Sequence, residues 1–176
     1  MEAALEQLSH VVISRPPQLK HIPARSFNRH LRPLLNHAAS GSFTTVAVMR
    51  EPIDWLGSWY RYRMREIEES DQSTAGMDFA GFIEAYLSPE PPRFAAVGTQ
   101  SGFLCDPNGF LLVDRVFRYE ALTSFVHFLE DTLGCEITLP HMNVSPKAPM
   151  TLPEDLRRRA MKVLANDYAI YNSLPG

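Results

Sequence analysis

A short apolar segment that runs directly into a helix constrains the fold of this chain more than any other feature. Residues 43–49 read Phe-Thr-Thr-Val-Ala-Val-Met, the pattern of a buried strand, and Arg50, Glu51 and Pro52 follow at once. Proline is favoured at the first position of a helix, and apolar residues recur at helical intervals from Pro52 to about Glu68. Open α/β sheets bind ligands where a strand ends and a helix begins, and free backbone amides there favour an anion. Arg50 at this junction therefore predicts an anion site, with phosphate as the obvious ligand.

Strands and helices alternate along the rest of the chain. A short strand is expected at 11–13, and residues 110–117 form either one arm of a hairpin or a central strand. Helices are expected over 23–37, 78–87, 122–133 and 151–171, with Asp78 as an N-cap and Thr151 opening a capping box. This alternation predicts an α/β architecture with a largely parallel sheet, in one domain that spans residues 1–176.

Composition narrows the class of protein. The chain has 176 residues, of which 45% are apolar and 21% charged, as in an ordinary soluble domain. Cys105 and Cys135 are far apart, and neither they nor the histidines have metal-ligand spacing, so we expect no metal and no disulfide. No apolar run is long enough for a membrane span, and we expect a cytoplasmic protein.

Charge is distributed unevenly along the sequence. The formal net charge is −3, which argues against general binding to nucleic acid. Residues 7–50 nevertheless contain six basic residues and no acidic one. This basic stretch suits a small polyanionic ligand better than a nucleic-acid strand.

Three segments, in order, then resemble a known family. They are Val-Met-Arg-Glu-Pro-Ile-Asp-Trp-Leu-Gly-Ser-Trp-Tyr at 48–60, Asp-Arg-Val-Phe-Arg-Tyr-Glu-Ala-Leu at 114–122 and Leu-Pro-His-Met-Asn-Val-Ser at 139–145. They resemble the 3′-phosphate motif, the central-strand step and the "LPHxNxS" loop of carbohydrate and heparan-type sulfotransferases that use 3′-phosphoadenosine 5′-phosphosulfate (PAPS). The resemblance covers about residues 20–173. It implies a three-layer, P-loop-like fold with a mainly parallel central sheet flanked by helices. The implied activity is sulfuryl transfer from PAPS to a hydroxyl of a carbohydrate or small molecule, with adenosine 3′,5′-bisphosphate as the other product.

The resemblance also implies roles for particular residues. Arg50 and Ser58 would bind the 3′-phosphate, while Trp55 stands where many relatives carry a second arginine. The alternative is that Arg50 pairs with a carboxylate such as Glu120 and that Ser58 only packs. Asn143, Ser145 and Lys147 would contact either the cofactor or the acceptor.

An attacking hydroxyl needs a base to take its proton, and histidine suits that role near neutral pH. His21 is the first candidate, and His141 the second. The alternative for each is a histidine that only satisfies its neighbours.

One family feature has no counterpart in the sequence. The loop Lys-x-Gly/Ala-Gly-Thr-Ser/Thr, which holds the 5′-phosphosulfate, is not present, and residues 1–8 resemble the helix that follows it. We expect an amino-terminally truncated chain that lacks the first strand and loop. The alternative function is a catalytically inactive, nucleotide-binding module with the sulfotransferase scaffold. A kinase has no positive support, since no Walker A motif is present.

Overall fold

The structure, a computed structural model, describes residues 5–39, 42–66, 70–138 and 148–175. Its contacts divide the chain into two compact units. Unit 1 comprises residues 1–49, 102–143 and 176, and unit 2 comprises residues 50–101 and 144–175. The expectation of a single domain stays a prediction.

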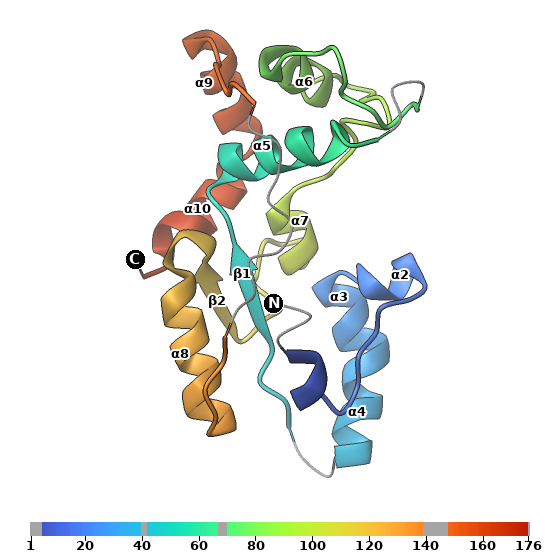
Figure 1. Cartoon of the computed structure of the whole chain (residues 1–176), viewed down its shortest axis with the longest axis vertical. Coiled ribbons are helices and arrows are strands. Elements are labelled where there is room, and N and C mark those ends of the chain that lie inside the picture. The colour runs from blue at the N-terminus through green and yellow to red at the C-terminus, as the bar shows by residue number, and fades with distance from the viewer. Residues whose placement is uncertain (1–4, 40–41, 67–69, 139–147, 176) are drawn as a thin grey trace. The chain divides into compact units, whose positions relative to one another are not determined.

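The sheet of unit 1 consists, in the described residues, of two parallel strands (Figure 1). Strand β1 (Val46–Met49) pairs with β2 (Arg115–Arg118), with Val46 opposite Arg115. The α/β class and the parallel pairing are therefore confirmed. Strand β1 begins three residues later than its apolar run, because the Thr45 amide and hydroxyl are taken by the Asp114 side chain instead of by a neighbouring strand.

Helix α8 (Leu122–Leu133) packs against β2. The ring centroid of Phe117 lies 5.2 Å from that of Phe125 and 5.3 Å from that of Phe128. The helix ends at Gly134, whose φ of +68° is the left-handed conformation that glycine adopts at low cost. Its limits agree with the sequence prediction.

The helix expected over 23–37 forms as three consecutive pieces. They are α3 (Ala24–Ser26), the π-helix η2 (Phe27–Leu31) and α4 (Arg32–Ala39). The strand expected at 11–13 is wrong, because these residues are exposed and pair with no strand. Three apolar residues are too few to fix a strand without a partner.

A polar contact fastens α4 to β1 within unit 1. Asp114 Oδ2 accepts hydrogen bonds from Thr45 N and Thr45 Oγ1, both at 2.7 Å, and lies 3.4 Å from Arg32 Nη2. Arg32 also donates to the Phe43 carbonyl at 3.2 Å. One cation of the basic stretch is thus paired with a carboxylate at the surface of unit 1, which sequence order alone did not indicate.

The Asp114 contacts predict a titration at acid pH. Hydrogen bonds from the Thr45 amide and hydroxyl, and then the Arg32 charge, hold the pKa of Asp114 below its usual value. Because the folded-state pKa is the lower one, this carboxylate contributes stability above its unfolded pKa, and the contribution is lost as the pH falls through the folded pKa. We expect the Thr45 amide NMR shift to titrate with a midpoint below about 3.9, the ordinary aspartate value. The titration should disappear in Asp114→Asn, and an unshifted midpoint would contradict the assignment.

Unit 2 is helical and holds the larger buried core. Its main helices are α5 (Pro52–Arg63), α6 (Phe79–Tyr86), α9 (Glu154–Val163) and α10 (Ala165–Ser173). The buried apolar side chains of this core are Ile53, Leu56, Tyr60, Phe79, Phe82, Ile83, Tyr86, Ala95, Leu156, Ala160 and Leu164. The apolar spacing of residues 52–68 and 78–87 predicted the buried faces of α5 and α6.

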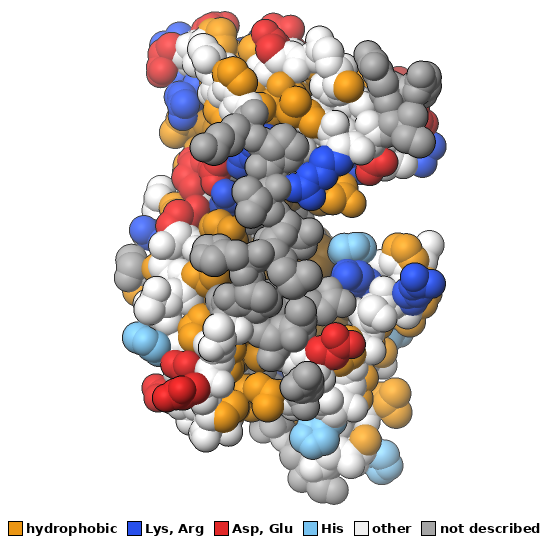
Figure 2. All heavy atoms as spheres, viewed as in Figure 1, with side chains coloured by type: hydrophobic (Ala, Val, Ile, Leu, Met, Phe, Trp, Pro, Cys, Tyr) orange, Lys and Arg blue, Asp and Glu red, His pale blue; other side chains and the backbone are white. Residues whose placement is uncertain are grey.

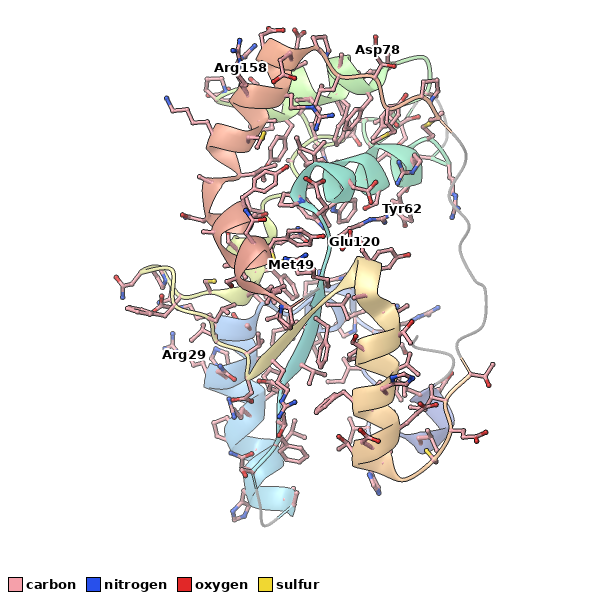
Figure 3. The ribbon with its side chains drawn as sticks, turned by 90° about the vertical axis from the view of Figure 1, so that its left-hand side faces the viewer. Arg29, Met49, Tyr62, Asp78, Glu120 and Arg158 are labelled. Atoms are coloured by element: carbon pink, nitrogen blue, oxygen red, sulfur yellow. The ribbon has the colours of Figure 1, made fainter. Side chains whose placement is uncertain are left out.

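Helix ends in unit 2 agree less well with the sequence. Asp78 caps α6 as predicted, accepting a 2.8 Å hydrogen bond from the Gly81 amide (Figure 3). The capping box at Thr151 is wrong, because α9 has Pro153 at its N-cap and no side-chain cap. The single helix expected there is interrupted at Leu164, which separates α9 from α10. Helix α5 ends at Arg63, before the predicted end.

The remaining elements are short. An antiparallel bridge joins Cys105 to Leu111 around the turn at 106–109, so a minimal hairpin precedes β2. Several apolar side chains of unit 1 remain at the surface, among them Leu34 and Phe110, and Figure 2 shows such side chains on one face. The short helices are η1 (Glu6–Leu8), α2 (Pro17–Lys20), α7 (Gln100–Leu104) and η3 (Tyr119–Ala121).

Candidate functional site

The start of α5 is capped by its own neighbours. Glu51 is the N-cap, and its carboxylate accepts a 2.7 Å hydrogen bond from the Asp54 amide. The Glu51 carboxylate also accepts from the Tyr168 hydroxyl, which hydrogen-bonds in turn with the Ile53 amide. Pro52 has no amide proton. The expectation of free amides that await an anion is therefore wrong for this first turn, and an anion would have to meet side chains.

Tyr168 is suited to this supporting role. Burial, followed by the hydrogen bond to Glu51, raises the pKa of the Tyr168 hydroxyl well above its usual range. The hydroxyl therefore stays protonated and keeps donating to Glu51 at neutral pH. Glu51 is thereby held at the helix terminus from the side of α10.

The backbone of Arg50 is held by a glutamine side chain. Gln100 Oε1 accepts from the Arg50 amide at 2.9 Å, and Gln100 Nε2 donates to the Arg50 carbonyl at 2.8 Å. This pair of bonds imitates the pairing that a neighbouring strand would provide. It fixes the residue that follows β1, whose last residue, Met49, is labelled in Figure 3.

Gln100 is itself fixed by Asp167, a fully buried carboxylate on α10. Asp167 Oδ2 accepts from the Gln100 amide at 3.0 Å, and Asp167 Oδ1 accepts from the Ser101 amide at 2.9 Å. These are orphan amides of the first turn of α7, and a carboxylate is a favourable acceptor there. Sequence reasoning missed Gln100 and Asp167, because nothing in the local pattern links residues 50, 100 and 167.

The side chains along one stripe of α5 form a charged cluster. Arg50 Nε donates to Asp54 Oδ2, and Arg61 Nη2 lies 3.6 Å from Asp54 Oδ1. Ser58 lies between Asp54 and Arg61 in sequence, and its hydroxyl donates to the Trp55 carbonyl at 2.7 Å. Residues spaced by three or four share a helix face, so these side chains point the same way. Arg50 thus has a carboxylate partner, Asp54, that the sequence interpretation had not named.

The aromatic residues of α5 divide into two groups. Tyr60 is buried and donates to the Met77 carbonyl at 2.7 Å, so it belongs to the core. Trp55, Trp59 and Tyr62 stack edge to face in series, with centroid distances of 6.4 and 5.9 Å. Tyr62, near the carboxyl end of α5 in Figure 3, is half exposed. Within this second group, Trp55 and Trp59 also pack against the core of unit 2, and Tyr62 is the member that is largely exposed.

The other predicted site residues belong to unit 1 or lie outside the described residues. His21 belongs to unit 1, where it is exposed and forms the C-cap of α2. Its chain neighbours Lys20 and Ile22 line an apolar cavity of about 340 Å³. His141, Asn143, Ser145 and Lys147 lie outside the described residues.

Among the described residues, no group of three or more His, Cys, Asp and Glu side chains is placed to hold a metal ion. Within those same ranges, no helix is long and apolar enough to cross a membrane. The chain matches no protein-family model, no curated protein and no solved structure.

Proposed function

We propose that the chain is a PAPS-dependent sulfotransferase that binds the 3′-phosphate of the cofactor with Arg50 and Ser58. The observation that carries the proposal is the α5 stripe in unit 2. Arg50 reaches one turn along the helix to Asp54, and Ser58 follows on the same face one turn later. The three-layer, P-loop-like architecture is part of this proposal.

The chemistry of the stripe suits a phosphate. A guanidinium offers a planar fork of donors that matches two phosphate oxygens, and a serine hydroxyl adds a neutral donor. The Arg50 side chain is 25% exposed, so its guanidinium is accessible although its backbone is fixed. Since Glu51 and Tyr168 satisfy the first-turn amides, selectivity for the 3′-phosphate would rest on side chains.

The transfer step follows from the chemistry of a phosphosulfate anhydride. The acceptor oxygen forms a bond to sulfur while the bond from sulfur to the 5′-phosphate oxygen breaks, and the acceptor proton passes to a base. We assign that base to His21, with His141 as the second candidate. Asn143, Ser145 and Lys147 would contact the cofactor or the acceptor, a carbohydrate or small-molecule hydroxyl.

Binding of adenosine 3′,5′-bisphosphate tests the proposal. We expect Arg50→Ala to weaken this binding by at least about 1.5 kcal/mol, as loss of a charged hydrogen bond should. Calorimetry should show unchanged binding of adenosine 5′-monophosphate, which has no 3′-phosphate. Arg93→Ala is the matched control, because Arg93 is exposed and pairs only at the surface with Asp71 in unit 2.

Equal affinity of the wild-type chain for the two nucleotides would refute the assignment to a 3′-phosphate. Transfer can be followed in the same preparations, from labelled PAPS to sugar and phenol hydroxyls. Transfer of the label would identify an enzyme, whereas binding without transfer is expected both of a nucleotide-binding module and of a chain without the 5′-phosphosulfate loop.

A further inference from the structure

The carboxylate of Asp54 lies between two arginines. Its Oδ2 accepts from Arg50 Nε, and its Oδ1 lies 3.6 Å from Arg61 Nη2, so each oxygen has its own guanidinium. The exposed fractions of the side chains are 25% for Arg50, 14% for Arg61 and 41% for Asp54. The anion is therefore the most accessible member of the cluster, and the two cations beneath it are more buried.

Helical spacing places the hydroxyl of Ser58 beside this cluster. Ser58 follows Asp54 by four residues and precedes Arg61 by three, so it lies one turn from each on the same face. Its hydroxyl now donates to the Trp55 carbonyl, but a hydroxyl can rotate and its oxygen has further capacity. Two guanidiniums thus contact one carboxylate, and a hydroxyl lies on the same helix face.

Glycine at position 57 leaves room for the Arg61 side chain in this arrangement. Gly57 is buried on the same helix face, and a Cβ there would lie 3.3 Å from Arg61 Nη1. The same Cβ would overlap the Met150 side chain at 1.9 Å. Side chains on a helix lean toward its amino end, so the glycine lets Arg61 lie back along α5 to reach Asp54.

The charges of the cluster favour exchange of the anion. Two guanidiniums held close together repel each other unless an anion separates them, and Asp54 supplies one negative charge. A phosphate monoester carries up to two negative charges and three free oxygens, so it can satisfy both forks and Ser58 together. Ion pairs as exposed as Asp54 contribute little to stability, and displacing its carboxylate therefore costs little.

We infer that Arg61 is a second cation for the 3′-phosphate and that Asp54 occupies the two arginines until the phosphate displaces it. This inference rests on the proposed function, because it concerns the same phosphate. It makes Arg61 a determinant of specificity and makes Asp54 a competitor built into the site. Before ligand binds, Asp54 keeps both guanidiniums oriented, which lowers the entropy lost on binding.

Calorimetry on the full chain, with adenosine 3′,5′-bisphosphate and adenosine 5′-monophosphate as probes, tests the inference. We expect Arg61→Gln to weaken the bisphosphate at least tenfold and to leave the monophosphate unchanged. Arg61→Lys, which keeps the charge but not the fork, should recover part of the loss. Asp54→Asn should tighten the bisphosphate at least threefold, because the amide competes less well for the arginines.

Matched controls separate this inference from a merely structural role. Arg93→Gln removes a surface arginine of unit 2 and should change neither affinity. Asp54→Asn leaves the helix cap intact, since Glu51 bonds the Asp54 backbone amide and not its side chain. Circular dichroism of each variant checks that folding is retained.

The outcomes distinguish the two proposals. If Arg50→Ala loses the preference for the bisphosphate while Arg61→Gln keeps it, the inference is overturned and the proposed function stands. If Asp54→Asn weakens the bisphosphate, Asp54 is part of the binding site and not a competitor, which also overturns the inference. If the wild-type chain shows no preference, both proposals fail together.

Discussion

Replacing Asp167 with alanine is expected to lower the free energy of unfolding by about 2–6 kcal/mol. Asp167 is fully buried and accepts hydrogen bonds from two backbone amides, those of Gln100 and Ser101. Leaving a buried donor without its partner costs about 1–3 kcal/mol, and alanine at this position would leave both amides without an acceptor. Urea denaturation followed by tryptophan fluorescence measures the effect, because both tryptophans of the chain lie on α5 in unit 2.

The neighbouring position supplies the control. Asn166 is exposed at the start of α10, and Asn166→Ala should change the stability by less than about 0.5 kcal/mol. Asp167→Asn, which keeps one acceptor oxygen, should fall between the two. Equal stability of Asp167→Ala and Asn166→Ala would show that the α7 amides find other partners and that the carboxylate is dispensable.

The effect of Asp167→Ala should extend to the candidate site. Gln100 holds both backbone groups of Arg50, and Asp167 holds the amide of Gln100. Loss of the carboxylate removes the cap that orients the first turn of α7, so the Gln100 side chain loses its fixed position. Arg50 is thus held by a chain of contacts from α10 through α7, all within unit 2.

The sequence predicted the part of this site that depends on local spacing. The apolar strand, Arg50 and Pro52 predicted the junction between strand and helix, and helical periodicity placed Ser58 on α5. The pairing of Arg50 with Asp54 was also within reach, since an i, i+4 spacing of opposite charges is a recognised helix signal. The alternative of a carboxylate partner for Arg50 was stated with Glu120 as the example, and Asp54 is a carboxylate that the structure pairs with Arg50.

The supporting contacts could not be predicted in this way. Gln100, Asp167 and Tyr168 meet the α5 junction only because the chain returns to it after 50 and 117 residues. A buried aspartate has no periodic signature, and an N-cap glutamate looks like any other acid at the start of a helix. The helix limits also changed where tertiary packing outweighed local propensity, as at Leu164 between α9 and α10.

Replacing Phe82 with alanine should lower the free energy of unfolding by about 3–5 kcal/mol, the usual cost of removing a buried phenyl ring. Phe82 is fully buried on α6, and its ring lies 5.8 Å from Tyr60, 6.4 Å from Phe79 and 6.5 Å from Phe94, centroid to centroid. The loss combines the hydrophobic free energy of burying the ring with the cost of the cavity that these three neighbours cannot close. Urea denaturation with the same fluorescence signal measures it.

Val163→Ala is the control, because Val163 is 56% exposed at the end of α9 in the same unit. This change should alter the stability by less than about 0.5 kcal/mol. Helix α5 packs against α6 through Tyr60 and Phe82. A loosened core in Phe82→Ala should therefore also make the positions of the Arg50 and Ser58 side chains less fixed. A loss below about 1 kcal/mol would mean that the aromatic cluster is not the centre of the core of unit 2, and the rigid support assigned to α5 would have to come from elsewhere.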